Sequence, residues 1–392
     1  MARRSIYLIA LAVLAPYLYD RYIALSAILA NRPGKLQKIY SIKSHEIKFQ
    51  NQIRNCEDVL LEEGMGIAFL SCDPGRDRWN TVMGTFLPAI GEQAGSDDGS
   101  IWIYDYSTPT LTDEEALKPL VLTNFAVPTD LHPLGIEFDA STSTLYVINH
   151  SRGSGSVIDV FQADVPRAVA KHVLTFKHPL IQTPNSIHSL GDGKLLITND
   201  HYMRAAISPL LSKVETFAGI PGGTVVYTDI RNPQDTKVLA HVPFANGLVM
   251  LNSTTVAVAS SSKAGVYLYT LNSDDHTLAF QKVVRTPAAA DNLSVDSNGK
   301  LLIAGHPFAP SLMKVSQGRA NCNLEGSEEE KKACECTAPS WVGEWSEKDG
   351  LKEIYKDSGE EFCSSSTFAR DVGRGVGIVS GLYERGILLV KE

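Results

Sequence analysis

Short apolar runs separated by turn-forming residues fill this chain from about residue 60 to its end. Typical runs are GIAFLSC, SIWIYDY, TLYVINH, KLLITND, GVYLYTL and GILLVKE. Turn signals stand between paired runs, as DGK at 192–194, NST at 252–254 and NGK at 298–300, which is where a β-hairpin requires them. Helical periodicity is scarce over the same region, so the chain is predicted to be all-β.

These runs recur in units of about 45 to 60 residues. The unit is measured from Ile136 to Ile187, then to Leu248 and to Leu293. That period is the length of one four-stranded blade and favours a propeller over a sandwich. No Pro/Ser-rich linker or charge block divides the 392 residues. We therefore predict one domain over residues 32–392, an all-β, six-bladed β-propeller, with an N-terminal apolar segment before it.

Residues 1–31 depart from the β pattern. Arg3 and Arg4 precede the apolar run SIYLIALAVLAPYLY, and Asp20 and Arg21 interrupt the apolar residues that follow. The first run is about 15 residues, shorter than the roughly 20 that a membrane-crossing helix needs. The segment is predicted to be a signal peptide or a signal-anchor, the alternative being a buried apolar helix. Either prediction places the domain in the secretory pathway, extracellular or membrane-anchored, and a signal-anchor would associate with the membrane.

The cysteines fit an oxidising compartment. Three of the six lie in the polar, acidic stretch NCNLEGSEEEKKACECTAPS. This stretch is predicted to belong to a surface insertion at about 317–350 and to contain a local disulfide, because it lacks the spacing and the fourth ligand of a zinc site. Asn252-Ser-Thr is an N-glycosylation sequon in an expected turn. We therefore expect disulfide bonds and a glycan.

Charge and missing motifs exclude several classes of function. A formal net charge of −8 argues against nucleic-acid binding, which requires a basic surface. No Gly-x-Ser-x-Gly elbow of a serine hydrolase is present, and DVGRGVG near the C-terminus lacks the spacing of a nucleotide-binding loop. Small neutral or apolar substrates remain.

Three asparagines occupy the same place in successive repeat units: Asn185 in PNSI, Asn246 in ANGL and Asn292 in DNLS. The innermost strands of propeller blades start near one mouth of the central channel, so these amides would face one another. With Asp291, and with Glu57 in NCEDVLL, they form a set of oxygen ligands of the kind that calcium prefers. The alternative is that asparagine simply suits the turn at a strand edge.

Eight short motifs occur in order along the chain: EDVLLEEGMGIAFLS, HPLGIEF, LYVINHS, PNSI, NDHY, FANGL, DNLSVD and AGHP. Together they closely resemble the motifs of the paraoxonases, a family of calcium-dependent lactonases and arylesterases, over roughly residues 50 to 390. The resemblance implies a six-bladed propeller with two calcium ions in its central tunnel, and hydrolysis of lactones and aryl esters. Matched motif by motif, the ligands of the family's catalytic calcium fall on Glu57, Asn185, Asn246, Asp291 and Asn292.

This sequence differs from the family pattern at two places. The family's second, structural calcium would be held by Asp58 and the backbone carbonyl of Ile136, but Ser186 stands where a further carboxylate is expected. Leu134 replaces the family's first catalytic histidine, the base that activates water. Leucine cannot accept a proton. The first calcium site is therefore better supported than the second, and better supported than the water-activating step.

Other residues are candidates for the proton transfers. His150, in an Asn-His motif, matches the family's second catalytic histidine. His132 lies two positions before Leu134, on the same face of an extended strand, and is a speculative substitute for the missing base. The others, which match ionisable residues of the family's pocket, are Asp200, His201 and His306. The alternative role of those two histidines is to satisfy backbone groups at strand ends.

The predicted function is therefore calcium-dependent hydrolysis of a small-molecule lactone or aryl ester, in which calcium polarises the carbonyl and a histidine assists the attack of water. A first alternative is a non-catalytic, calcium-stabilised propeller that acts as a binding protein, with Leu134 marking lost chemistry. A second is a strictosidine-synthase-like propeller enzyme, against which the complete calcium set argues.

Overall fold

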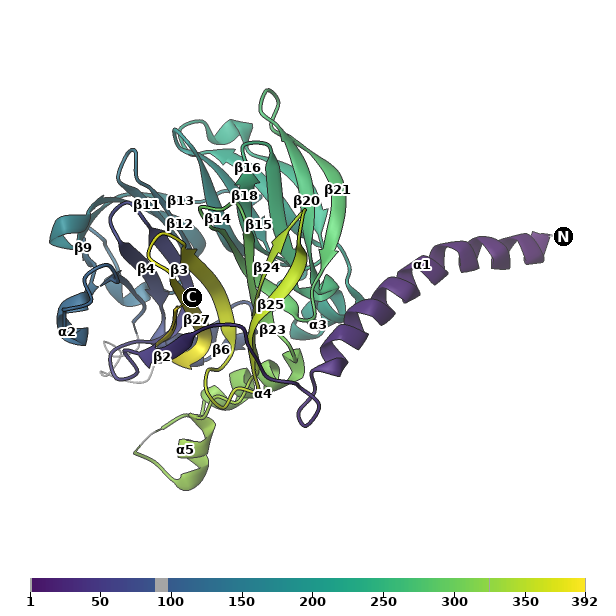
Figure 1. Cartoon of the computed structure of the whole chain (residues 1–392). Coiled ribbons are helices and arrows are strands. Elements are labelled where there is room, and N and C mark those ends of the chain that lie inside the picture. Colours follow the sequence, from purple (N-terminus) through teal and green to yellow (C-terminus); the bar gives the residue numbers. More distant parts are fainter. Residues whose placement is uncertain (1, 89–97, 324, 392) are drawn as a thin grey trace.

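The computed structural model describes residues 2–88, 98–323 and 325–391, and consists mainly of antiparallel sheets in a propeller-like arrangement (Figure 1). One four-stranded sheet contains β14 (Pro184–Gly191), β15 (Lys194–Asn199), β16 (Gly223–Asp229) and β17 (Lys237–Val242). Another contains β18 (Ala245–Asn252), β19 (Thr255–Ser260), β20 (Gly265–Asn272) and β21 (Thr277–Arg285). In both, consecutive strands pair in chain order, as the hairpin signals predict.

Two further sheets have four consecutive strands and a fifth from elsewhere in the chain. One contains β10 (Pro133–Asp139), β11 (Thr144–Ser151), β12 (Gly155–Asp164) and β13 (Val169–Phe176), with β9 (Val121–Thr123) added in parallel. The other contains β22 (Ala289–Val295), β23 (Leu301–His306), β24 (Ser340–Ser346) and β25 (Gly350–Asp357), with β1 (Ile39–Tyr40) at its edge.

The largest sheet joins the two ends of the domain. It contains β2 (Ser44–Lys48), β28 (Ile387–Lys391), β27 (Val376–Arg385), β3 (Arg54–Glu62), β4 (Ile67–Cys72), β7 (Ser100–Asp105) and β8 (Leu117–Pro119), and β26 (Ser365–Asp371) pairs with β27. The short strands β5 (Trp79–Asn80) and β6 (Thr85–Phe86) form a separate hairpin. Because this sheet is continuous through β27 and β3, the sheets are not six separate ones. The all-β, propeller-like fold is confirmed, and the number of six blades stays a prediction.

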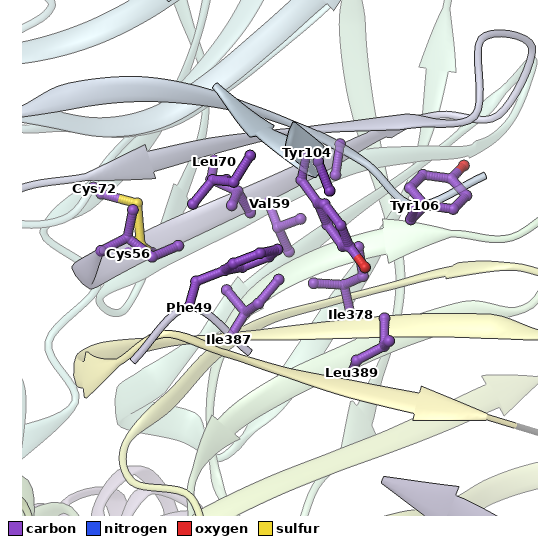
Figure 2. Packing of buried hydrophobic residues seen from close by; sticks show 14 of the residues in the cluster. Phe49, Cys56, Val59, Leu70, Cys72, Tyr104, Tyr106, Ile378, Ile387 and Leu389 are labelled. Carbon is purple, nitrogen blue, oxygen red and sulfur yellow. A yellow bond between two sulfur atoms is a disulfide. The ribbon is translucent and has the colours of Figure 1, made fainter. Parts of the chain in front are cut away.

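Early and late strands share one hydrophobic core in this sheet. Phe49, Val59 and Leu70 pack against Ile378 and Leu389 from the other end of the chain (Figure 2). All five side chains are buried, so this closure removes two otherwise open sheet edges and the apolar faces beside them from water.

Helices α1 (Ala2–Ala30), α2 (Asp113–Ala116), α3 (Pro209–Ala218), α4 (Ala309–Arg319) and α5 (Glu328–Ala333) lie outside the sheets. Ser208 caps α3 through a side-chain hydrogen bond to the Leu211 N–H, Pro209 opens the helix, and Gly219 ends it in a left-handed conformation. Sequence periodicity did not reveal α3 or α4.

The N-terminal half of α1 extends away from the strands, and its C-terminal half packs on the domain (Figure 1). Asp20 forms ion pairs with Lys263 and Arg285, and the Asn31 side-chain amide donates to the Pro287 carbonyl oxygen at 2.7 Å. These contacts hold the end of α1 against the strand ends of the β18 to β21 sheet. Among the residues that the structure describes, no helix has the length and apolarity needed to cross a bilayer.

Three disulfides join Cys56 to Cys72, Cys322 to Cys334 and Cys336 to Cys363. The second is the local disulfide predicted for the acidic stretch, and α5 protrudes there from the body of the molecule (Figure 1). Residues 340–346, inside the predicted insertion of about 317–350, form β24 with the fully buried Trp341. The segment outside the sheets therefore ends before β24. The sequon residue Asn252 is exposed, so a glycan there stays a prediction that the fold allows.

Candidate functional site

The first strand of each sheet unit carries a β-bulge at the same place. In β14, β18 and β22 the pairing register shifts between Pro184 and Ile187, between Ala245 and Leu248, and between Ala290 and Leu293. In β3, β10 and β26 it shifts next to Glu57, Leu134 and Ser366. A bulge places two residues opposite one and redirects their side chains. Asn185 and Asn246 stand first in their bulges, whereas Asn292 stands second, after Asp291. The prediction that the three asparagines occupy one equivalent position is therefore wrong for Asn292, and Asp291 takes that place.

The first residue of five of these bulges lines one cavity of about 280 Å³. These residues are Glu57, Leu134, Asn185, Asn246 and Asp291. All are nine-tenths buried or more. The remaining wall is largely apolar and comes from α1, α3, α4 and the β5–β6 hairpin, so a small molecule of low polarity would fit between the helices and the strand ends.

Three side-chain oxygens of this cavity have no hydrogen-bond partner among the described residues: Glu57 Oε2, Asn185 Oδ1 and Asn246 Oδ1. Buried polar atoms are normally satisfied, so three unsatisfied oxygens around one cavity indicate a partner that the described residues do not supply, either a hydrogen-bond donor or a cation. Carboxylate and amide oxygens are the ligands that calcium prefers. No cluster of three or more His, Cys, Asp or Glu placed to hold a metal occurs within the described ranges, since this set has only two carboxylates and relies on amides. The residues fit a calcium ion.

Burial and the nearby carboxylates of Asp58 and Asp291 raise the pKa of Glu57 well above its ordinary value, because each disfavours a further negative charge. The Asn292 side-chain amide donates to Glu57 Oε1 at 2.8 Å, which leaves only Oε2 unsatisfied. A divalent cation between Glu57 and Asp291 would remove the repulsion between their two negative charges and favour the ionised form of both.

The second bulge residues face a different cavity of about 320 Å³, lined by Asp58, Ser186 and Asn292. Asn292 therefore reaches Glu57 from this second side and is not a lining residue of the first cavity.

At the predicted second calcium site, the side-chain oxygens accept hydrogen bonds from the protein. The Ile136 N–H donates to Asp58 Oδ2 at 3.0 Å, and the Thr367 hydroxyl donates to Oδ1 at 3.0 Å. The Ser186 hydroxyl oxygen accepts from the Leu248 N–H at 3.1 Å. Burial raises the pKa of Asp58 to about 6, despite these donors. Beside its hydrogen bond, Asp58 Oδ2 keeps a further lone pair for a cation, while Ser186 supplies no carboxylate. The second calcium site stays a prediction.

The five candidate proton-transfer residues are not all at the first cavity. His306 lines it, with Nε2 at 2.8 Å from Asp291 Oδ2 and with Nδ1 buried and without a partner among the described residues. His132 has Nδ1 at 3.1 Å from Asp73 and accepts at Nε2 from Arg152 at 3.0 Å, and it does not line the cavity. Both of its ring nitrogens are thus already engaged.

His201 and Asp200 connect a sheet to α3. His201 Nδ1 lies 3.1 Å from Asp200 Oδ1, and Nε2 lies 2.6 Å from the Thr216 hydroxyl on α3. Neither residue lines the first cavity. This geometry fits the alternative of a structural role, in which the pair holds α3 over the strand ends.

His150 is buried beside the cavity but does not line it. Nδ1 lies 2.8 Å from the Ser156 hydroxyl, while Nε2 has no partner in the described parts of the chain. Burial lowers the pKa of His150 to about 4, since the protonated ring would be desolvated. Leu134, which stands where the first of the two catalytic histidines was expected, supplies no group that could accept a hydrogen bond.

The buried, neutral His150 makes an acid-sensitivity prediction. Its folded pKa of about 4 lies below the unfolded value of 6.5, so the unfolded chain binds more protons between these two pH values. Stability is therefore present above pH 6.5 and is lost as the pH falls toward 4, by up to about 3 kcal/mol. Urea unfolding at pH 7.5 and 4.5 should show a smaller acid loss for His150→Gln than for wild type.

His178→Gln serves as the control, because His178 is partly exposed and does not line the cavity. An equal acid loss in wild type and His150→Gln would contradict the buried neutral ring.

Sequence reasoning missed three groups of cavity residues. α1 contributes Ala24, Leu25 and Ile28, and α3 contributes Thr216 and Phe217. Arg76, in the turn after β4, also lines the cavity. The Ser208, Pro209 and Gly219 signals could have located α3, whereas a single arginine in a turn carries no recognisable pattern.

Comparison with known proteins supports the motif-based prediction. A sequence profile of the Arylesterase family matches residues 81–323. This chain belongs to the arylesterase family. The matched segment includes Asn185, Asn246 and Asp291, while Glu57 precedes it.

Two curated relatives of this chain are paraoxonases. Serum paraoxonase/lactonase 3 of Oryctolagus cuniculus is 28% identical over 292 residues, which cover 73% of this chain and 76% of that protein. Serum paraoxonase/arylesterase 2 of Canis lupus familiaris is 29% identical over 174 residues, covering 44% of this chain and 47% of the relative, about half its length.

Solved structures share the fold of this chain at low identity. A gluconolactonase from Xanthomonas campestris superposes with a TM-score of 0.50 at 12% identity, covering 93% of this chain and 91% of that one. A luciferin-regenerating enzyme gives a TM-score of 0.51 at 12% identity, covering 89% and 95%. These likenesses concern the fold alone.

Proposed function

We propose that this arylesterase-family chain is a calcium-dependent hydrolase of lactones, aryl esters or both. The observation that carries the proposal is the set of three unsatisfied, buried oxygens beside Asp291 in one cavity. The names of the relatives, which include lactonase and arylesterase, agree with this reaction class. The largely apolar wall favours an uncharged ester or lactone over a polar substrate.

In this proposal the cation is held by Glu57, Asn185, Asn246 and Asp291, and Asn292 positions Glu57 through its 2.8 Å hydrogen bond. When bound, calcium supplies Lewis-acid polarisation of the substrate carbonyl. The apolar residues of α1, α3 and α4 hold the rest of the substrate and exclude bulk water, which strengthens every electrostatic interaction in the cavity.

His306 is the proposed proton acceptor. Nε2 donates to Asp291, which fixes the ring, and the lone pair on Nδ1 remains free to take a proton from water. The water oxygen then bonds to the carbonyl carbon, the ester C–O bond breaks, and the alcohol oxygen takes the proton. His150, His132, Asp200 and His201 do not line the cavity and are given no direct contact with substrate.

Activity with and without chelator tests this function. Purified protein should hydrolyse phenyl acetate or a δ-lactone, and a calcium chelator should abolish the activity until calcium is restored. Asn246→Ala should lose at least about 10-fold of the activity at limiting calcium, because one ligand is removed. Asn252→Ala, at an exposed asparagine in the same strand, is the matched control and should behave as wild type. A protein without chelator-sensitive turnover of either substrate class would refute the proposal.

One observation favours the non-catalytic alternative, namely that Leu134 lines the cavity where a histidine is expected. A calcium-stabilised binding protein would show a rise in melting temperature on calcium addition but no hydrolysis in the same assay.

We also propose that the domain lies in the secretory pathway. Its three disulfides are stable in an oxidising compartment, and the relatives are described as serum proteins. Expression with a reporter of N-glycosylation at Asn252, followed by glycosidase treatment, would test this location.

A further inference from the structure

Arg76 presents a buried guanidinium at the wall of the first cavity. It lies in the turn Pro74–Asp77 and is 3% exposed. Within residues 2–88, 98–323 and 325–391 its one hydrogen bond runs from Nη2 to the Pro133 carbonyl oxygen at 2.8 Å, and Nε has no partner.

The acidic residues on either side of Arg76 are engaged elsewhere. Asp73 pairs with His132 at 3.1 Å, and Asp77 pairs with Arg54 at 2.6 Å. In the described part of the chain, no carboxylate forms an ion pair with Arg76. A buried charge costs several kcal/mol unless it is paired, so arginines are rarely buried without a carboxylate. None of the described residues therefore places a carboxylate in contact with this guanidinium.

The charges of the cavity also indicate that an anion would pair with Arg76. Glu57 and Asp291 together balance a divalent cation. Of the cations that line the cavity, Arg21 is paired with Asp20 and Lys213 is exposed, so Arg76 is the buried one that no carboxylate of the described residues pairs. The other lining residues are largely apolar, among them Ile28, Phe244 and Met313. The complementary ligand therefore has an apolar body and one anionic group of oxygens, and planar carboxylates match the guanidinium fork.

We propose that Arg76 is an anion-binding residue of this cavity and that its ligand is a carboxylate on an apolar body. The inference deepens the proposed hydrolase function and rests on it. Two sources share this chemistry. Hydrolysis of an apolar lactone or ester yields such a carboxylate as its product, and a substrate with a free carboxylate carries the same group from the start.

Calorimetric binding of hexanoate and hexanamide to the calcium-loaded protein tests the site without turnover. The two ligands share an apolar chain and differ in charge. Wild type should bind hexanoate at least about 10-fold more tightly than hexanamide. Arg76→Gln retains a donor for the Pro133 carbonyl but removes the charge, and should lower the preference below about 2-fold while hexanamide affinity is unchanged. Lys213→Gln removes an exposed cation of the same cavity and should keep the wild-type preference.

Several results would overturn the assignment. Equal affinity of wild type for both ligands would do so, as would a full preference in Arg76→Gln, which would assign the anion to calcium alone. Equal weakening of both ligands in Arg76→Gln would mean that the residue only supports the fold. If that variant does not fold, Arg76→Met decides, because it keeps an apolar stem and removes the buried charge: a lost preference supports the site, and an unchanged one overturns it.

A kinetic arm separates the two sources of carboxylate. If kcat/KM favours a carboxylated lactone over its neutral analogue, and Arg76→Gln loses this preference, Arg76 binds the carboxylate of the substrate. If Arg76→Gln loses only inhibition by the hydroxy-acid product, the residue holds the product. A protein that shows the binding preference but hydrolyses neither compound would refute the proposed hydrolase and leave the anion site standing.

Discussion

Glu57→Gln is expected to remove the stabilisation that calcium gives to the folded protein and to lower kcat/KM at least about 100-fold. In wild type, calcium at 100 times its dissociation constant should add about 2.7 kcal/mol of stability, because the folded state alone presents the ligand set. The variant keeps the shape of the side chain but loses the charge on the unsatisfied oxygen of the cavity.

The difference in stability between Glu57→Gln and wild type should change sign when calcium is removed. In chelator, wild-type Glu57 is a buried acid close to Asp58 and Asp291, and these charges together with burial raise its pKa. Glutamine avoids this cost, so the variant should be more stable than wild type without calcium and less stable with it. Thermal unfolding with calcium and with chelator, beside metal analysis of the dialysed protein, measures both effects.

Glu62→Gln provides the control, since Glu62 lies at the other end of the same strand and does not line the first cavity. A calcium response in Glu57→Gln as large as that in wild type would contradict the assignment of Glu57 as a ligand.

His306→Gln is expected to lower kcat by about 10²- to 10⁴-fold at saturating calcium, the usual contribution of a positioned general base. Glutamine can still donate a hydrogen bond to Asp291 but has no basic nitrogen to replace Nδ1. His241→Gln, at an exposed position, should match wild type.

Leu134→His tests whether the general base is His306 or a histidine at position 134. If His306→Gln retains the wild-type kcat and Leu134→His raises it, the base belongs at position 134 and the role given to His306 is wrong. A loss in His306→Gln that Leu134→His partly restores would mean that either position can serve the same water.

The repeated positions of the sequence led to residues that line the first cavity, because local patterns determine these positions. That these residues bind calcium stays a prediction. Asn185, Asn246 and Asp291 recur at equal places in hairpins of similar length, and each lies at a bulge in the structure. Helix α3 over the cavity was missed although Ser208-Pro209 and Gly219 mark its two ends, because the β pattern of the surrounding sequence outweighed these signals.

The acid–base residues could not be resolved from sequence for a different reason. Whether a histidine is free depends on partners distant in the chain. His132 is engaged by Asp73 and Arg152, whereas His306 keeps Nδ1 free. The burial of Arg76 is likewise a tertiary property, visible only once β3, β10 and α1 are packed around one cavity.

The bulge at the start of each inner strand has an evolutionary consequence. Backbone pairing resumes beyond the bulge whatever its side chain is, since glutamate, leucine, asparagine, aspartate and serine all occupy the equivalent place. The bulge position thus accepts different residue types while the pairing of the strands stays the same. Substitutions at this place, such as leucine for histidine at position 134, therefore change a residue that lines the cavity while the pairing of the strands is kept.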